Sequence, residues 1–326
     1  MENIMVSICC ITYNHEKYIA EAIEGFLMQK TSFKFEILIH DDASTDDTAK
    51  IIKKYEDKYP DLIKVIYQKE NQYSKGVKIS DTLYKKSKGK YIALCEGDDY
   101  WIDPYKLQKQ VEYLENNEKC TFCFTNAIKE DLITNKKNIF VEQGTLNKQV
   151  FKLKDFDFGE LGVMGFIPTA SFIFPRKNIY NMPKFYFSSF KAGDFKLKLA
   201  CAYQGYAHFI NEPMTVYRCG VENSVTTIWG KEDSKKAIER NRSFINLIEQ
   251  MDEETKYMYQ KNLDRLKIEF EKNILFFERS KRLLLDERYL EYYEDLSLKK
   301  KIIMNLYLEY PNLYNFLKRI KSMIKG

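Results

Sequence analysis

Three carboxylates stand together directly after an apolar stretch of the sequence. Residues 91–95 read Tyr-Ile-Ala-Leu-Cys and are followed by Glu96, Gly97, Asp98 and Asp99. Because burying an ionised carboxylate is costly unless it is paired or bound to a metal, we expect these side chains to be solvated or to face a cation. Mg²⁺ and Mn²⁺ take one or two protein carboxylates and fill their remaining positions with water and phosphate oxygens. The segment therefore predicts a site for a divalent metal and a diphosphate, with a solvated turn as the alternative.

A second acidic segment follows another apolar stretch. Residues 35–40 have the composition of a β-strand, and they lead into Asp41-Asp42-Ala43-Ser44-Thr45-Asp46. Upstream, a strand-like stretch ends at Thr12-Tyr13-Asn14 and is followed by a helical pattern from Tyr18 to Leu27. Such alternation is typical of a parallel sheet covered by helices. Since ligands of open α/β sheets gather at the carboxyl ends of strands, we expect both acidic segments to border one pocket.

The segment after the first strand-like stretch contains no glycine-rich phosphate loop. Thr12-Tyr13-Asn14-His15 has neither a glycine nor a nearby arginine, so the Rossmann and Walker sequences are absent. A nucleotide would therefore be held by the acidic strand ends and a cation.

Taken together, these motifs resemble those of the family 2 glycosyltransferases, which have the GT-A fold. The motifs are Thr12-Tyr13-Asn14, Asp41-Asp42-Ala43-Ser44-Thr45-Asp46 and Glu96-Gly97-Asp98-Asp99. They occur in order along the chain, and the resemblance covers about two thirds of it. It implies an α/β fold of the GT-A type, with a Rossmann-like, mostly parallel sheet flanked by helices and a helical C-terminal region.

The resemblance also implies roles for individual residues. The first two motifs cradle the nucleoside in this family, and the residues expected to bind the nucleotide sugar here are Thr12, Tyr13, Asn14, Asp41, Asp42 and Ser44. The third motif corresponds to the family's Asp-X-Asp signature, so Glu96 and Asp98 are expected to approach the ribose and to hold Mn²⁺ or Mg²⁺, with Asp99 beside them. Glu96 departs from the family's pattern, in which an Asp stands at this position.

A base and a cationic residue complete the predicted site. Asp194 precedes a helical pattern and would lie at a helix N-terminus, where a carboxylate is kept ionised. The family's base is an Asp at this position, usually after a Glu that Gly193 replaces here. Arg218 ends the sequence Tyr217-Arg218, which resembles the family's closing motif, and it is expected to pair with diphosphate unless it forms a structural pair with a carboxylate.

The implied reaction is one in-line displacement that inverts the anomeric centre of the donor sugar. The donor is expected to be a UDP-sugar, and the acceptor a hydroxyl of a glycan or a lipid-linked glycan in cell-surface polysaccharide biosynthesis. The aromatic region 151–190 is expected to form much of the acceptor wall. Two alternatives are a non-catalytic protein that binds sugar nucleotides or glycans, and a nucleotidyltransferase, which normally needs a Gly-rich basic loop.

Composition indicates one core domain with an appendage. Of the 326 residues, 44% are hydrophobic, and glycine becomes rare after about residue 231. We therefore expect a catalytic domain at 1–230 and a helical region at 231–326. Seven cysteines without a secretory signal favour the cytoplasm. Nucleic acid is not an expected partner, since 52 basic residues are balanced by 47 acidic ones and no nucleic-acid motif occurs.

The end of the chain, 296–326, is predicted to be a basic amphipathic segment. It carries seven basic residues and one acidic residue, and its apolar positions recur at helical spacing. Such a segment can lie peripherally on the anionic inner face of a cell membrane, or it can dock on the protein with its lysines solvated. No apolar run reaches the roughly 20 residues that a spanning helix needs.

Overall fold

The computed structural model describes residues 4–142, 146, 148–155, 167–188, 193–222, 224–294, 297–310 and 313. The chain divides into two compact units, Met1–Thr227 and Ile228–Gly326. The first unit contains all of the motifs described above, and the second contains the helical region.

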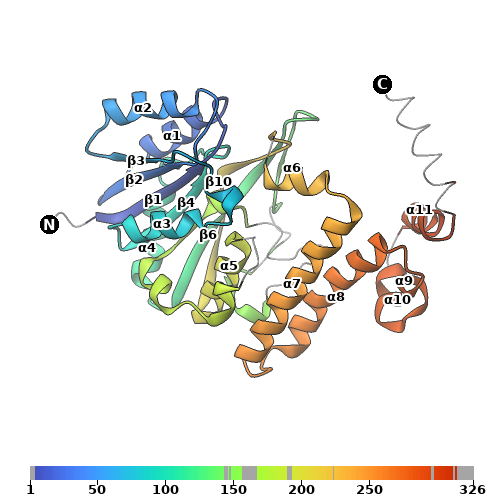
Figure 1. Cartoon of the computed structure of the whole chain (residues 1–326). Helices are drawn as coiled ribbons and strands as arrows, with labels where there is room; N and C mark the ends of the chain where they lie inside the picture. Colours follow the sequence, from blue (N-terminus) through green and yellow to red (C-terminus); the bar gives the residue numbers. More distant parts are fainter. Residues whose placement is uncertain are drawn as a thin grey trace. The chain divides into compact units, whose positions relative to one another are not determined.

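One mixed sheet organises the first unit (Figure 1), with the strand order β3-β2-β1-β4-β9-β6-β10-β5. The strands in chain order are β1 (Ile4–Thr12), β2 (Lys34–Asp41), β3 (Ile63–Tyr67), β4 (Tyr91–Glu96), β5 (Tyr100–Trp101), β6 (Cys120–Asp131), β7 (Lys136–Ile139), β8 (Val150–Phe151), β9 (Phe172–Pro175) and β10 (Tyr206–Cys219). Strands β3, β2, β1 and β4 are parallel neighbours, whereas β9 lies antiparallel between β4 and β6. The predicted α/β fold with a mostly parallel sheet is confirmed.

The helices of the first unit pack on this sheet through apolar faces. They are α1 (Ile19–Leu27), α2 (Thr48–Lys58), α3 (Ile79–Lys86), α4 (Lys106–Asn116) and α5 (Gly193–Gln204), while α6 (Val225–Gly230) crosses the boundary between the units. Short 3₁₀ helices are η1 (Tyr73–Lys75), η2 (Leu153–Asp155), η4 (Thr169–Ser171), η5 (Arg176–Asn181) and η6 (Lys184–Phe187). Helix α1 buries Ile19, Ala22, Ile23 and Phe26, which is the spacing of a single helical face.

The central strands are buried on both faces. Val6, Ile8 and Cys10 on one face of β1 are inaccessible to solvent and belong to one apolar cluster, and Ser7 and Cys9 on the other face are 0% and 3% exposed. A close-packed core of this kind holds strand ends at fixed positions, because small shifts of packed side chains are costly. The loops at the carboxyl ends of β1, β2 and β4 are therefore carried on a rigid base.

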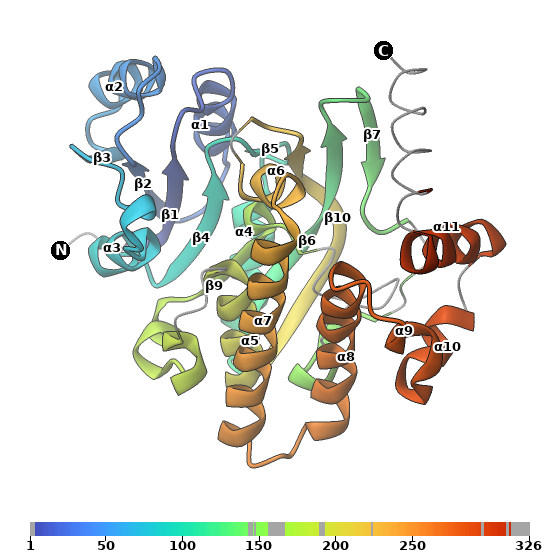
Figure 2. The same ribbon diagram turned by 45° about the vertical axis from the view of Figure 1, so that its right-hand side comes forward.

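The second unit is helical, as the sequence predicted. Its helices are α7 (Ser234–Glu254), α8 (Gln260–Phe277), α9 (Arg282–Leu285), α10 (Glu287–Glu294) and α11 (Leu298–Glu309). Helices α7 and α8 lie side by side (Figure 2), with the rings of Phe244 and Phe270 stacked at a centroid distance of 4.2 Å. Most of the predicted basic end, at 311–312 and 314–326, lies outside the described residues. Within the part of the chain that the structure describes, no helix is both long and apolar enough to cross a bilayer.

Candidate functional site

The register of the sheet brings both acidic segments to one edge. Thr12 at the end of β1 pairs with Asp41 at the end of β2, and Ile11 of β1 pairs with Glu96 at the end of β4. All three strands are parallel, so their carboxyl ends lie next to one another. The two acidic segments therefore border the same edge of the sheet.

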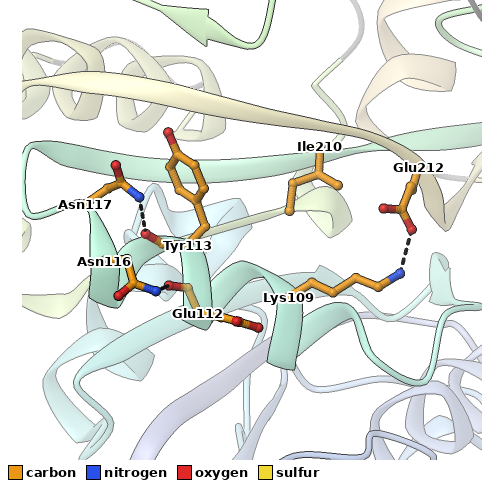
Figure 3. A pocket seen from close by; sticks show the side chains of 7 residues that line it. All are labelled: Lys109, Glu112, Tyr113, Asn116, Asn117, Ile210 and Glu212. Atoms are coloured by element: carbon orange, nitrogen blue, oxygen red, sulfur yellow. Dashed lines mark hydrogen bonds and ion pairs between the residues drawn. The ribbon is translucent and has the colours of Figure 1, made fainter.

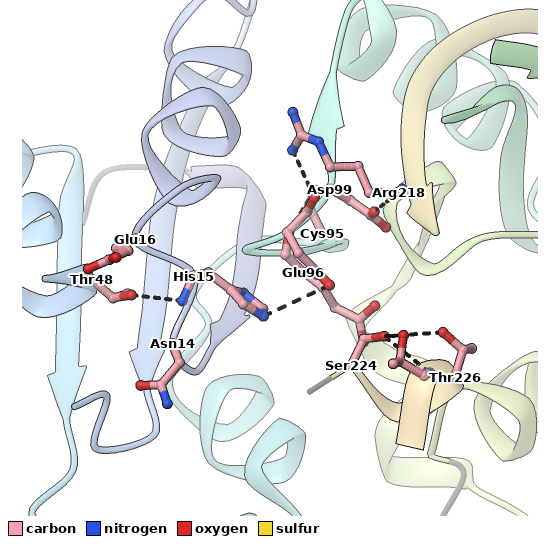
Figure 4. A network of polar contacts seen from close by, with 12 residues as sticks. Asn14, His15, Glu16, Thr48, Cys95, Glu96, Asp99, Arg218, Ser224 and Thr226 are labelled. Atoms are coloured by element: carbon pink, nitrogen blue, oxygen red, sulfur yellow. Dashed lines mark hydrogen bonds and ion pairs between the residues drawn. The ribbon is translucent and has the colours of Figure 1, made fainter. Parts of the chain in front are cut away.

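The loops after β1 and β2 are held together by hydrogen bonds. The N–H of Asn14 donates to Oγ of Ser44 at 2.9 Å, and Oδ1 of Asn14 accepts from the N–H of Thr45 at 2.8 Å. The N–H of His15 donates to Oγ1 of Thr48 at 2.8 Å (Figure 4). Asn14 has a φ of 56°, a left-handed conformation that asparagine tolerates better than most residues. These bonds make one wall from two separate loops.

The two aspartates after β2 are engaged inside this wall. Oδ1 of Asp41 accepts from the hydroxyl of Ser44 at 2.5 Å, and burial raises the pKa of Asp41 although the Ser44 hydrogen bonds oppose the shift. The carboxylate of Asp42 accepts from the backbone N–H groups of Gln72 at 2.8 Å and Tyr73 at 3.0 Å. Asp42 thus fixes the segment that follows β3. At the same edge, the ring of Tyr13 is partly exposed.

Gly97 allows the acidic motif to pass close to the end of β1. Its N–H donates to the carbonyl of Ile11 at 2.9 Å, and a Cβ at this position would lie 2.6 Å from Oγ1 of Thr12 and 3.0 Å from Nδ1 of His15. Oγ1 of Thr12 and Nδ1 of His15 are themselves buried without a hydrogen-bond partner among the described residues. Nε2 of His15 lies 3.9 Å from Oδ2 of Asp98, and burial lowers the pKa of His15, so a neutral imidazole faces this carboxylate at pH 7.

The three carboxylates of the acidic motif repel one another. Crowding by protein atoms, together with the charges of Asp98 and Asp194, raises the pKa of Glu96 to about 8. Burial and the charges of Asp98 and Glu96 raise the pKa of Asp99 well above its usual range, and Oδ2 of Asp99 has no partner among the described residues. Because the side chain of Glu96 reaches solvent, a cation could approach it and relieve this repulsion.

The donor set fits a divalent metal that is shared with a ligand. Among the described residues, no group of three or more His, Cys, Asp or Glu side chains is arranged so that it could hold a metal ion. Mg²⁺ and Mn²⁺ are commonly bound by one or two carboxylates together with substrate phosphates. Asp98 and Glu96 could supply the protein part of such a site.

Asp194 lies in the first turn of α5, where it pairs with a residue that the motifs did not single out. Nζ of Lys198 lies 3.1 Å from Oδ2 of Asp194, and the side chains are 6% and 43% exposed respectively. Burial opposes ionisation of Asp194, but the charge and hydrogen bond of the Lys198 ammonium together with backbone hydrogen bonds outweigh it and lower the pKa of Asp194. The helical pattern could have predicted this pair, since residues four apart on a helix are neighbours. Asp194 is also close enough to Glu96 to contribute to the raised pKa of that carboxyl.

Arg218 is surrounded by groups of the protein. Its guanidinium pairs with Glu21 and lies 3.3 Å from Glu130, and Nη1 donates to the carbonyl of Asp98 at 2.8 Å. Its backbone N–H donates to Oδ1 of Asp99 at 2.9 Å. The residue is only 7% exposed. The geometry therefore matches the structural pair that the sequence left as an alternative for this arginine, and it fastens the end of β10 to the acidic motif.

A groove elsewhere in the first unit does not include these residues. It has a volume of about 360 Å³ and lies between α4 and β10, lined by Lys109, Tyr113, Ile210 and Glu212 among others (Figure 3). Lys109 crosses it to reach Glu212 at 2.5 Å. None of the residues predicted to bind the donor lines this groove. The predicted acceptor region 151–190 lies partly outside the described residues, at 156–166 and 189–190.

The sequence is similar to proteins from mycobacteria and enteric bacteria. It is 36% identical over 217 residues to an uncharacterized protein of Mycobacterium tuberculosis, and the aligned region covers 65% of this chain and 58% of that protein. It is 37% identical over 131 residues to the Escherichia coli enzyme UDP-Glc:alpha-D-GlcNAc-diphosphoundecaprenol beta-1,3-glucosyltransferase WfaP. The aligned region covers 40% of this chain and 49% of the enzyme. The chain thus spans about half of the length of these curated relatives.

The fold is similar to that of solved glycosyltransferase structures. The Staphylococcus aureus TarS fragment 1–349 in complex with UDP-GlcNAc matches with a TM-score of 0.54 and 16% identity, covering 91% of this chain and 78% of that one. The mannosyltransferase PcManGT of Pyrobaculum calidifontis, in complex with GDP-Man and Mn²⁺, matches with a TM-score of 0.51 and 14% identity, covering 98% and 84%. At this identity, the matches establish the GT-A fold.

The family assignment comes from the sequence of the sheet itself. The model of the family described as Glycosyl transferase family 2 matches residues 7–179. This range contains most of β1 and all of β2 and β4, with the three motifs at their carboxyl ends. The resemblance seen in those motifs is therefore confirmed, and the chain belongs to glycosyl transferase family 2.

Proposed function

We propose that the protein is an inverting, metal-dependent glycosyltransferase. It moves a sugar from a nucleotide-sugar donor to a hydroxyl of a glycan or glycolipid in cell-surface polysaccharide biosynthesis. The observation that carries this proposal is the cluster of Glu96, Asp98 and Asp99, which ends β4 next to the strand that carries the wall, with Asp194 close enough to help raise the pKa of Glu96. Carboxylates that can hold a cation at the leaving diphosphate, with a separate ionised base for the acceptor hydroxyl, suit this reaction.

The wall after β1 and β2 would bind the nucleoside. The residues assigned to the donor are Thr12, Tyr13, Asn14, Asp41, Asp42 and Ser44. Asp42 and Asn14 act by holding their loops, while Tyr13 presents an exposed ring that can contact a base. Mn²⁺ or Mg²⁺ held by Asp98 and Glu96 would supply positive charge for the departing diphosphate. Glu96 would bind the cation as a carboxylate, and the cation would oppose the crowding and the charges of Asp98 and Asp194 that raise its pKa to about 8.

Asp194 would act as the base on the acceptor side. Its ionised carboxylate accepts the proton of the acceptor hydroxyl while the oxygen attacks the anomeric carbon. Lys198 keeps Asp194 ionised and limits its movement through the contact at 3.1 Å. Attack from the side opposite the leaving group inverts the anomeric centre.

The relatives support this assignment of substrates. The name of the E. coli relative specifies a UDP-glucose donor and an acceptor sugar linked through diphosphate to undecaprenol. The similar structures were solved with UDP-GlcNAc and with GDP-Man and Mn²⁺. We take a UDP-sugar as the donor and a lipid-linked glycan as the acceptor. The seven cysteines are free thiols, and six of them are buried, which supports a reducing, cytoplasmic setting.

Exchange of Asp98 for asparagine tests the donor site. We expect UDP to bind the wild-type protein more tightly with Mn²⁺ than with EDTA. Asp98→Asn should weaken the Mn²⁺-dependent binding at least about tenfold, because a neutral amide is a poorer ligand for a hard cation. Isothermal titration calorimetry measures both affinities. Asp103→Asn is a matched control, since Asp103 pairs with Lys109 away from the motif. Equal affinity of Asp98→Asn and wild type for UDP would remove Asp98 from the metal site.

We further propose that the C-terminal segment contacts an anionic membrane surface. In the described part of this segment, α11 exposes Leu298, Ile302 and Ile303 beside Lys299 and Lys301. Apolar side chains can enter the interface while each lysine contributes about 1 kcal/mol of attraction to anionic lipid.

Flotation with lipid vesicles measures this contact. The full chain should float with vesicles rich in phosphatidylglycerol and stay unbound with phosphatidylcholine alone. Exchange of Lys299, Lys300 and Lys301 for glutamine should reduce the bound fraction. A matched triple exchange of Lys53, Lys54 and Lys58 on α2 provides the control. Equal flotation with both lipids, or none with either, would contradict the proposal.

A further inference from the structure

Two lysines from separate parts of the first unit converge around one tyrosine. Lys78 immediately precedes α3, and Lys196 lies in the first turn of α5. Nζ of Lys78 donates to the carbonyl of Tyr186 at 3.3 Å, and Nζ of Lys196 donates to the carbonyl of Ser188 at 2.9 Å. The two ammonium groups lie 5.1 and 5.9 Å from the centroid of the Tyr186 ring. Both ammonium groups therefore lie near the same ring, and the charge of Lys78 acts on that of Lys196.

The positive charge of this pair exceeds the negative charge near it. Burial and the charge of Lys78 lower the pKa of Lys196 to about 8, and Asp81 is the carboxylate that opposes this shift. Asp81 also lies close enough to Tyr186 to help raise the pKa of that hydroxyl. Two ammonium groups therefore stand against one carboxylate whose charge acts on Lys196. Oγ of Ser188, beside them, is buried without a partner among the described residues.

The pair joins two segments of the candidate site. Lys78 lies on the connection whose residues Gln72 and Tyr73 hold Asp42 on the nucleoside side. Lys196 belongs to the same helical turn as Asp194, on a different face of α5. Only Lys78 is exposed, so a ligand would meet it first and reach Lys196, which is 1% exposed, behind it.

We propose that Lys78 and Lys196 form a binding site for a phosphate or diphosphate group of the acceptor. Phosphate oxygens accept hydrogen bonds from both ammonium groups and remove their mutual repulsion. In the proposed function, on which this inference rests, the donor diphosphate binds a metal at Asp98 and Glu96. A separate cationic pair, one member of which lies in the same helical turn as Asp194, therefore serves a second phosphate, which the acceptor carries.

Binding of inorganic pyrophosphate in the presence of EDTA tests the pair without the metal site. Isothermal titration calorimetry on the full chain should show binding that weakens with added salt. Lys78→Gln should reduce the affinity at least about tenfold, whereas Lys78→Arg should retain most of it. Lys85→Gln, an exposed lysine in the last turn of α3, is the matched control and should bind as wild type. Lys78 is the residue to exchange because it is exposed, so its loss leaves the packing intact.

The second part of the experiment separates the acceptor from the donor. Lys78→Gln should bind UDP in the presence of Mn²⁺ as wild type does, while Asp98→Asn should lose UDP and keep pyrophosphate. If Lys78→Gln weakened both ligands equally, the lysines would serve the donor and the proposal would be wrong. It would also be wrong if wild type did not bind pyrophosphate or if Lys78→Gln bound it unchanged. Failure of UDP to bind wild type would instead count against the proposed function.

Discussion

Asp194→Asn should lower kcat by about a thousandfold and leave the affinity for UDP almost unchanged. An amide of the same shape preserves the contact with Lys198 but does not accept the proton of the acceptor hydroxyl, and general bases typically contribute a factor of this size. The donor is the sugar nucleotide that raises the melting temperature of the protein most, since a ligand of the folded state stabilises it. Steady-state transfer from this donor measures kcat, and calorimetry measures UDP binding.

Asp233→Asn is the matched control for this exchange. Asp233 also starts a helix, α7, where it accepts from the N–H of Lys236 at 2.9 Å, and asparagine is an equally good cap. This variant should keep wild-type kcat. Full turnover by Asp194→Asn would exclude Asp194 as the base.

The pH profile of the wild-type enzyme should agree with the same role. The pKa of Asp194 is lowered, because the Lys198 ammonium and backbone hydrogen bonds together outweigh the effect of burial. A lowered pKa means that the carboxyl is half protonated only at a pH below the usual pKa of an aspartate, about 3.9. The loss of kcat/KM that reflects protonation of Asp194 should therefore have its midpoint below this pH.

Arg218→Gln should destabilise the protein by about 3 kcal/mol and weaken UDP binding with Mn²⁺. The exchange removes the guanidinium from Glu130, Glu21 and the carbonyl of Asp98, and loss of one partner from a buried pair leaves an uncompensated charge. Because Glu21 is half-exposed and can be rehydrated, we expect a loss near the lower end of the range for buried pairs. Urea unfolding followed by circular dichroism measures the change.

Arg240→Gln in the second unit is the matched control for Arg218. Arg240 also pairs with a carboxylate, Glu232 at 3.0 Å, and lies over an aromatic ring, Trp229 at 4.7 Å, and both partners belong to the second unit. Its exchange should leave UDP affinity unchanged. If Arg218→Gln lost UDP binding at full stability, the guanidinium would be a direct ligand of the diphosphate, as the closing motif first suggested.

The sequence alone determined the parts of the site that depend on local patterns. Continuous apolar stretches predicted β1, β2 and β4, because strands covered on both faces are apolar throughout. Carboxylates at the ends of two of them stood out, since a buried strand does not tolerate such residues without a partner. The chemical class followed from these motifs and their order.

The tertiary structure alone decided which partners those residues have. Arg218 meets Glu21 across 197 positions of the chain, and Lys78 approaches the carbonyl of Tyr186 across 108, so periodicity within one element holds no sign of either contact. The antiparallel insertion of β9 between β4 and β6 was equally outside local patterns, because strand pairing depends on distant segments. Charges act through space, and for this reason the raised pKa of Glu96 and the lowered pKa of Lys196 emerge only when the folded chain sets the distances between groups.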